Sequence, residues 1–190
     1  MDTLTLKIIF MVGFVAAWAI RTPYQKQHQQ TKHLVPQERI LFMLIYVGMV
    51  VSPLIYVFSP LLSFADYRSP VWAGYVGGIV FAIALWLLWR SHDDLGKNWS
   101  PTVEIKEGHT LVSNGVYQQI RHPMYTAFWL WSAAQALILP NWIAGLGGIL
   151  SFGMTYFLRI QQEEQMMIEQ FGAEYKAYMQ RTKRLIPYLF

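Results

Sequence analysis

The stretch Met124–Leu158, MYTAFWLWSAAQALILPNWIAGLGGILSFGMTYFL, decides the fold because it contains no charged residue over 35 positions. Arg121 and His122 lie just before it, and Arg159 follows it directly. A membrane-spanning helix needs about 20 mainly apolar residues, since the hydrocarbon core is about 30 Å thick. The stretch is too long for one crossing, and Leu139-Pro140-Asn141 near its middle is typical of a helix stop and a turn. We therefore predict a hairpin of two membrane helices.

Three further apolar segments precede this hairpin, at Leu4–Ile20, Ile40–Phe64 and Val71–Trp89. The first is interpreted as a retained helix, because it has no clear small-x-small cleavage site and Arg21 follows it directly. The composition, 54% hydrophobic and 14% charged, is also too apolar for an ordinary soluble domain. The sequence thus predicts an all-α, polytopic integral membrane protein with five transmembrane helices. No internal repeat or linker divides residues 1–190, so they form a single membrane domain.

The distribution of basic residues predicts how the helices are oriented. With five spans, thirteen of the fifteen Lys and Arg residues fall on one side of the membrane, and only Lys7 and Arg68 on the other. Segments rich in Lys and Arg stay in the cytoplasm. We expect the polar loop and the tail to be cytoplasmic and the N-terminus to lie on the opposite side. The basic excess is a matter of topology and does not imply a nucleic-acid partner.

Polar chemistry is concentrated on that side, in the loop Ser91–Arg121 and in the tail after Arg159. The tail from Gln162 to Met179 has apolar residues at helical spacing, which predicts an amphipathic helix or a broken pair of helices. The chain has no cysteine, so thiolate nucleophiles, disulfides and cysteine-ligated metals are excluded. No metal site is predicted. The arrangement favours a reaction at the membrane surface.

Four motifs within about residues 86–187, the catalytic half of the chain, occur in the order of a known family. They are Leu95-Gly96-x-Asn98-Trp99-Ser100; His109-Thr110-Leu111-Val112-x-x-Gly115-Val116-Tyr117-x-x-x-Arg121-His122-Pro123-x-Tyr125; Arg159-x-x-x-Glu163-Glu164; and Phe171-Gly172-x-Glu174-Tyr175-x-x-Tyr178. This pattern resembles the isoprenylcysteine carboxyl methyltransferase family, and the five predicted spans resemble its compact prokaryotic members. The resemblance implies S-adenosylmethionine as the methyl donor and S-adenosylhomocysteine as the product.

The resemblance also implies a set of cofactor-binding residues in the polar loop, at the start of the fourth helix and in the tail. They are Glu104, His109, Thr110, Leu111, Val112, Tyr117, His122, Pro123, Met124, Tyr125 and Glu163. The residue types suit this ligand, because Leu111, Val112 and Tyr117 can offer an apolar face to adenine. Glu163 can accept hydrogen bonds from ribose hydroxyls or pair with the ammonium group. His122 and Tyr125 can bind the carboxylate or line the route to sulfur. Pro123 can also start the fourth helix.

Arg159 is the candidate catalytic residue. A carboxylate acceptor is already ionised at neutral pH and needs no strong base, but its desolvation is costly unless a cation receives it. Arg159 can do so, and it lies four residues from Glu163, on the same face if the helix continues. Alternatively, Arg159 is only a topology anchor. Arg121 is a second candidate for the catalytic role, with ordering of the loop as the favoured alternative. Trp99 is interpreted as a packing or membrane-interface residue.

The acceptor itself stays open at this point. The function expected from the resemblance is methyl transfer to the carboxylate of an isoprenylcysteine-like acceptor, a lipophilic or lipidated molecule that enters from the bilayer lipids. A phospholipid amine or a small thiol is an alternative acceptor, because related families share the His-Pro-x-Tyr and Glu-Glu features. Two other interpretations are an NADPH-dependent sterol-type reductase and a non-enzymatic membrane protein.

Overall fold

The structure of the protein is a computed structural model, and the residues described are 2–26, 36–99 and 110–189. Its regular elements are all helical, and within these ranges there are two isolated β-bridges but no strand. The elements are α1 (Thr3–Lys26), α2 (Pro36–Tyr46), the π-helix η1 (Val47–Val51), α3 (Ser52–Phe58), the 3-10 turns η2 (Ser63–Ala65), η3 (Gly96–Asn98) and η4 (Gly115–Gln118), α4 (Val71–Leu95), α5 (Pro123–Ile138) and α6 (Gly147–Arg181). The all-α prediction is confirmed.

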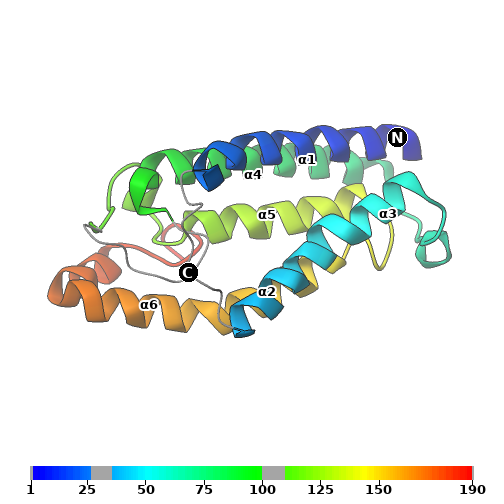
Figure 1. Ribbon diagram of the computed structural model, residues 1–190. Helices are drawn as coiled ribbons and strands as arrows, with labels where there is room; N and C mark the ends of the chain where they lie inside the picture. The colour runs from blue at the N-terminus through cyan, green and yellow to red at the C-terminus, as the bar shows by residue number, and fades with distance from the viewer. Residues whose placement is uncertain (1, 27–35, 100–109, 190) are drawn as a thin grey trace.

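Three helical segments are long and apolar enough to cross a membrane. They are Thr3–Gln25, Glu38–Phe58 and Val71–Asn98, and they contain the three apolar segments expected before the hairpin, apart from the end of the second. The second consists of α2, η1 and α3, which follow one another without a break in the helical path (Figure 1). Large apolar side chains such as Val12, Ile79 and Met43 are more than half exposed on these helices, as lipid-facing residues are. The protein is thus a polytopic membrane protein.

The predicted hairpin forms as two helices, with α5 ending at Ile138 and α6 beginning at Gly147. Asn141 organises the connection: its Nδ2 donates to the Leu62 carbonyl (2.6 Å) and to Asp66 (2.7 Å), and its Oδ1 accepts from the amide of Ala144 (2.9 Å). The predicted break is confirmed. With 16 residues, α5 extends only about 24 Å, less than the hydrocarbon core. The two remaining spans, and with them the total of five, stay a prediction.

The helices alternate in direction along the chain (Figure 1). α1, α4 and α6 run away from the end that holds the N-terminus, and the α2–α3 rod and α5 run back toward it. The last turn of α4, the first turn of α5 and the second half of α6 therefore gather at one end of the bundle. An aromatic core holds the bundle together, with Phe10 against Phe81 and Phe14 against Trp131. This packing fixes the positions of the polar helix ends.

The tail is a continuation of α6, kinked at Gly172, where φ is 54°. This confirms the broken helical pair. After Arg181 the chain returns along the start of α5: the Arg121 amide donates to the Lys183 carbonyl (2.8 Å), and the His122 amide donates to the Arg184 carbonyl (3.1 Å). The C-terminal segment is in this way attached to the His-Pro segment.

Candidate functional site

A cavity opens where the polar helix ends meet, and most of the predicted site residues line it. Its walls include Thr110, Leu111, Val112, Tyr117, His122, Met124, Tyr125, Arg159 and Glu163. Pro123 is buried at the first position of α5 but does not line the cavity, so it acts here as the start of the helix. Glu104 and His109 lie outside the described residues.

Asp94, in the last turn of α4, and Asn98, in η3, hold the loop that carries Thr110–Tyr117. The Thr110 amide donates to Asn98 Oδ1 (3.0 Å), and Asn98 Nδ2 donates to the Thr110 hydroxyl (3.2 Å). The Val116 amide donates to Asp94 Oδ2 (2.8 Å). Gly115, with φ of 57°, has no room for a Cβ, which would overlap the Asp94 carboxylate. These contacts set Leu111 and Val112 against the cavity.

Tyr117 is a buried wall of the cavity, fixed from two sides. The Tyr178 hydroxyl donates to the Tyr117 carbonyl (2.7 Å), and the Tyr117 hydroxyl lies 3.4 Å from the Ser91 carbonyl. Burial, and next the negative charge of Glu163, raise the pKa of the Tyr117 phenol well above its usual value. The phenol therefore stays neutral, and the ring presents an uncharged aromatic surface.

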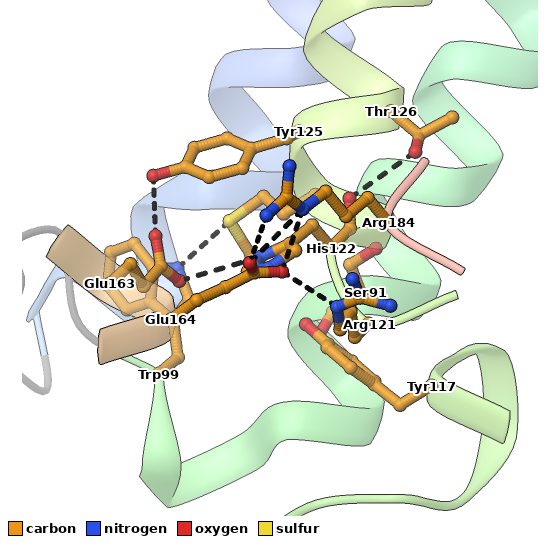
Figure 2. A network of polar contacts seen from close by, with 11 residues as sticks. Ser91, Trp99, Tyr117, Arg121, His122, Tyr125, Thr126, Glu163, Glu164 and Arg184 are labelled. Carbon is orange, nitrogen blue, oxygen red and sulfur yellow. Dashed lines mark hydrogen bonds and ion pairs between the residues drawn. The ribbon is translucent and has the colours of Figure 1, made fainter. Parts of the chain in front are cut away.

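Tyr125 and His122 bring α5 against the polar half of α6 (Figure 2). The Tyr125 hydroxyl donates to Glu163 Oε2 (2.6 Å), and His122 Nδ1 lies 3.8 Å from Glu163 Oε1. The two rings are stacked with centroids 5.6 Å apart. The Glu163 side chain is still 31% exposed, so its carboxylate is positioned by protein contacts yet accessible to a ligand. Three residues predicted to bind the cofactor, His122, Tyr125 and Glu163, thus lie together.

The neighbouring carboxylate, Glu164, is buried and points away from Tyr125, toward Arg121 and Arg184 (Figure 2). It accepts hydrogen bonds from Arg121 Nε (2.7 Å) and from Arg184 Nε (3.0 Å), and His122 Nε2 lies 3.3 Å from it. Arg121 also donates to the Thr182 carbonyl (2.7 Å). Burial alone would raise the pKa of Glu164, but the hydrogen bonds from His122, Arg184 and Arg121 outweigh it and hold the pKa well below its usual value.

In this arrangement Arg121 ties the start of α5 to α6 and to the C-terminal segment. Its role in the reaction stays a prediction. The sequence analysis did not identify Glu164 as the residue that Arg121, Arg184 and His122 surround, although Glu164 is part of the Arg-x-x-x-Glu-Glu motif. It also missed Arg184, which comes twenty residues later in the chain.

Arg159 lies in the cavity wall on the same face of α6 as Glu163, because the helix continues through both. Its guanidinium already has protein partners. Nη2 lies 3.5 Å from Glu38 Oε1, and the guanidinium lies over the Phe42 ring, 5.5 Å from its centroid. Both partners belong to α2. The sequence analysis did not identify Glu38. The one feature that could have indicated it is an acidic residue directly before an apolar segment.

Apolar residues complete the cavity. Trp99 is buried and donates its ring N–H toward the Met124 sulfur (3.3 Å), and Met166 and Met167 line the side formed by α6. Trp99 thus contributes to the cavity wall as well as to packing. Within the described ranges, no group of three or more His, Asp or Glu side chains is placed to hold a metal ion. The cavity thus has apolar walls on one side and charged or polar side chains, among them Arg159 and Glu163, on the other.

Comparison with known proteins assigns the fold and motifs to a family. Residues 75–169 match the isoprenylcysteine carboxyl methyltransferase (ICMT) family. The chain belongs to this family. It is similar to the protein-S-isoprenylcysteine O-methyltransferase of Dictyostelium discoideum, with 33% identity over 138 residues that cover 70% of this chain and 54% of that protein. The Arabidopsis thaliana protein-S-isoprenylcysteine O-methyltransferase B is 27% identical, covering 75% of this chain and 73% of the relative.

A solved structure of an ICMT protein has the same fold. The structure of the eukaryotic intramembrane Ras methyltransferase ICMT matches 91% of this chain and 60% of its own, with a TM-score of 0.57 and 29% identity. The family resemblance predicted from the motifs is confirmed. The chain spans little more than half the length of the Dictyostelium relative, and the 96 residues that match the human protein-S-isoprenylcysteine O-methyltransferase cover 34% of it.

Proposed function

We propose that this chain is a membrane-embedded methyltransferase that uses S-adenosylmethionine and transfers a methyl group to the carboxylate of a lipophilic, isoprenylcysteine-like acceptor. The observation that carries this proposal is the convergence of the motif residues. One cavity at the polar ends of apolar helices is lined by Thr110–Val112 and Tyr117 from the loop, His122, Met124 and Tyr125 at the start of α5, and Arg159 and Glu163 from α6. Membership of the ICMT family supports the same reaction, as does similarity to protein-S-isoprenylcysteine O-methyltransferases.

The residues present fit S-adenosylmethionine, which supplies a methyl group on a sulfonium sulfur when it is bound. Leu111, Val112 and the neutral Tyr117 ring form an apolar wall suited to adenine. The accessible Glu163 carboxylate can accept hydrogen bonds from hydroxyl or ammonium groups. His122 and Tyr125 are held beside it. The predicted roles of Glu104 and His109 remain part of the proposal on the resemblance alone.

The charges in the cavity favour an anionic acceptor. Among the described residues that line it, Arg21, Arg121 and Arg159 are cationic and Glu163 is the one acid. A carboxylate is ionised at neutral pH and needs no general base, whereas an amine acceptor must first lose a proton. We propose that Arg159 orients the acceptor carboxylate at the reacting end, in exchange with or beside Glu38. The lipophilic part of the acceptor enters from the bilayer.

Ligand binding tests this proposal. In isothermal titration of the detergent-purified full chain, S-adenosylhomocysteine and S-adenosylmethionine should bind, and NADPH should not. Binding of NADPH in place of the two adenosyl ligands would instead support a reductase, and binding of none of the three would support a protein without this enzymatic function. Either of these outcomes contradicts the proposal.

We further propose that the cavity faces the cytoplasm. The helix ends that line the cavity lie at the end of the bundle opposite the N-terminus (Figure 1). Thirteen of the fifteen basic residues belong to segments assigned to that side. A reporter that is active only in the cytoplasm, fused after Phe190, should be active in cells. Activity of a reporter that works only on the outer face would reverse the orientation.

A further inference from the structure

α2 forms one wall of the candidate site and contacts α6 there through the Glu38–Arg159 ion pair. Phe42 of α2 lines the cavity, and the Arg159 guanidinium lies over its ring. On the outer face of α2, Ile40 and Met43 are more than half exposed, as lipid-facing residues are. Toward α1, an apolar cavity separates the two helices. Two sides of α2 therefore lack a packed protein partner, and the helix is attached to the bundle through α6 and η1.

The π-helix η1 joins α2 to a point of the rod that is fixed in the bundle. The Gly48 carbonyl accepts hydrogen bonds from Gln135 Nε2 of α5 (2.9 Å) and from the Ser52 hydroxyl (3.3 Å). A Cβ at Gly48 would overlap the side chain of Ser151, so the rod and α6 approach closely here. A π-helical turn widens a helix locally and is a position at which helices bend. η1 is thus a fixed point about which α2 can pivot.

The Glu38–Arg159 contact is long for an ion pair whose two side chains are only 17% and 10% exposed. The distance from Arg159 Nη2 to Glu38 Oε1 is 3.5 Å, whereas charge-assisted hydrogen bonds are about 2.7–2.9 Å long. The Arg121–Glu164 pair, in contrast, has a separation of 2.7 Å and is joined by Arg184. The carboxylate of Glu38 is therefore easier to exchange than that of Glu164.

An incoming carboxylate can replace Glu38 without leaving the Arg159 charge uncompensated. The guanidinium has a carboxylate partner before and after the exchange, so the free-energy cost of an unpaired buried cation is avoided. Glu38 also lies in the first turn of α2, where the positive end of the helix dipole favours an acidic side chain. The displaced carboxylate thus keeps a favourable environment at the polar end of the bundle.

We propose that Glu38 is an autoinhibitory carboxylate, which pairs with Arg159 and holds α2 against α6 until an acceptor carboxylate displaces it. On displacement, α2 pivots at η1 away from α6. This inference rests on the proposed methyltransferase function and adds to it a regulatory contact from α2, outside the motifs that carry the family resemblance. An acceptor without a negative charge offers Arg159 no carboxylate in exchange, so it leaves the pair closed. Glu38 in this way favours anionic acceptors.

The first test is the sign of the effect of Glu38→Gln on acceptor binding. The affinity of the full chain in nanodiscs for an S-isoprenylated N-acetylcysteine is measured with S-adenosylhomocysteine bound. Glu38→Gln should bind this acid at least about threefold more tightly than the wild type, because a competing closed state lowers the apparent affinity by the fraction of molecules that are open. If Glu38 instead orients Arg159 for the acceptor, its replacement weakens binding. Weakened or unchanged binding of the acid overturns the proposal.

Glu169→Gln is the matched control, since it removes the same charge from an exposed position of α6. It should leave the affinity for the acid unchanged. Both variants should bind S-adenosylhomocysteine within about twofold of the wild type, which also shows that they fold.

The second test follows the position of α2 directly. The chain has no cysteine, so spin labels attached through Ile40→Cys in α2 and Gln161→Cys in α6, both at exposed positions, report the separation of the two helices. Pulsed electron paramagnetic resonance should give a single population of distances without ligand. Glu38→Gln in the labelled protein should add a population of longer distances. A saturating concentration of the acid should add the same population, and its primary amide at that concentration should not.

A distance distribution that stays the same in Glu38→Gln, or on addition of the acid, would overturn the proposal. The measurement on Glu38→Gln needs neither a ligand nor methyl transfer. Methyl transfer by the wild type is scored separately, so failure of the Glu38 proposal is distinguishable from failure of the proposed function.

Discussion

Replacing Glu164 with Gln should destabilise the protein by about 3 kcal/mol or more, the largest stability effect that we expect from a single polar substitution in this chain. The Glu164 side chain is 6% exposed, and its carboxylate forms ion pairs with Arg121 and Arg184 and lies 3.3 Å from His122 Nε2. Removing its charge leaves two guanidinium groups without their carboxylate, one of them only 10% exposed. Because these contacts join α5, α6 and the C-terminal segment, the loss should appear in global unfolding.

The measurement is the thermal unfolding midpoint of the purified protein in detergent, with Glu163→Gln as the control. Glu163 is adjacent in sequence but 31% exposed, with a hydrogen bond from Tyr125, so its replacement should cost about 1 kcal/mol. Equal midpoints for the two variants would show that the Glu164 cluster does not hold the fold together.

Lowering the pH should also destabilise the wild-type protein, because protonation removes the negative charge of Glu164. The pKa of Glu164 in the folded protein is below its ordinary value of 4.5, so its contribution to stability is complete above that value. The contribution is lost as the pH falls below 4.5 and approaches the lowered pKa. Glu164→Gln cannot titrate at this position. Its stability should therefore fall less steeply than that of the wild type over this acidic range.

Replacing Glu163 with Ala should weaken S-adenosylhomocysteine binding by tens of fold, a loss of about 2 kcal/mol, while the protein still folds. The carboxylate is positioned by Tyr125 at 2.6 Å and is accessible from the cavity. The effect is limited to about this size because the side chain is partly exposed.

Glu169→Ala is the control for this titration, because Glu169 is exposed on the same helix and bonds only to Gln165 within the described residues. It should leave the affinity unchanged. Unaltered binding by Glu163→Ala would remove Glu163 from the ligand site.

The membrane helices and the cavity could be predicted because their signals are local. Apolar segments of sufficient length predict the helices, and Pro140 with Asn141 predicts the turn between α5 and α6. Ordered motifs identified Tyr125 and Glu163, which do meet. The lengths of α1 and α4 were underestimated, since both helices continue past the apolar segment into polar residues, to Lys26 and Leu95.

The pairings between distant residues could not be predicted. Whether Glu163 or Glu164 faces the cavity depends on the rotation of about 100° per residue along α6, fixed only by tertiary packing. The Glu38–Arg159 pair joins residues 121 positions apart, and the place of Arg184 depends on the chain reversing after Arg181. In the sequence, Arg21 counts only as one of the basic residues that set the membrane topology, because nothing local indicates that its side chain faces a cavity.

Methyl transfer itself tests the central claim most directly. The detergent-solubilised full chain is incubated with methyl-labelled S-adenosylmethionine and an S-isoprenylated N-acetylcysteine, and the lipophilic products are separated and analysed for label. The account predicts a labelled methyl ester of the acid, formed by the wild type and absent when the acceptor is the amide. Label that appears instead on an amine or thiol acceptor, or no transfer to any of these by a folded protein that binds S-adenosylmethionine, would contradict it.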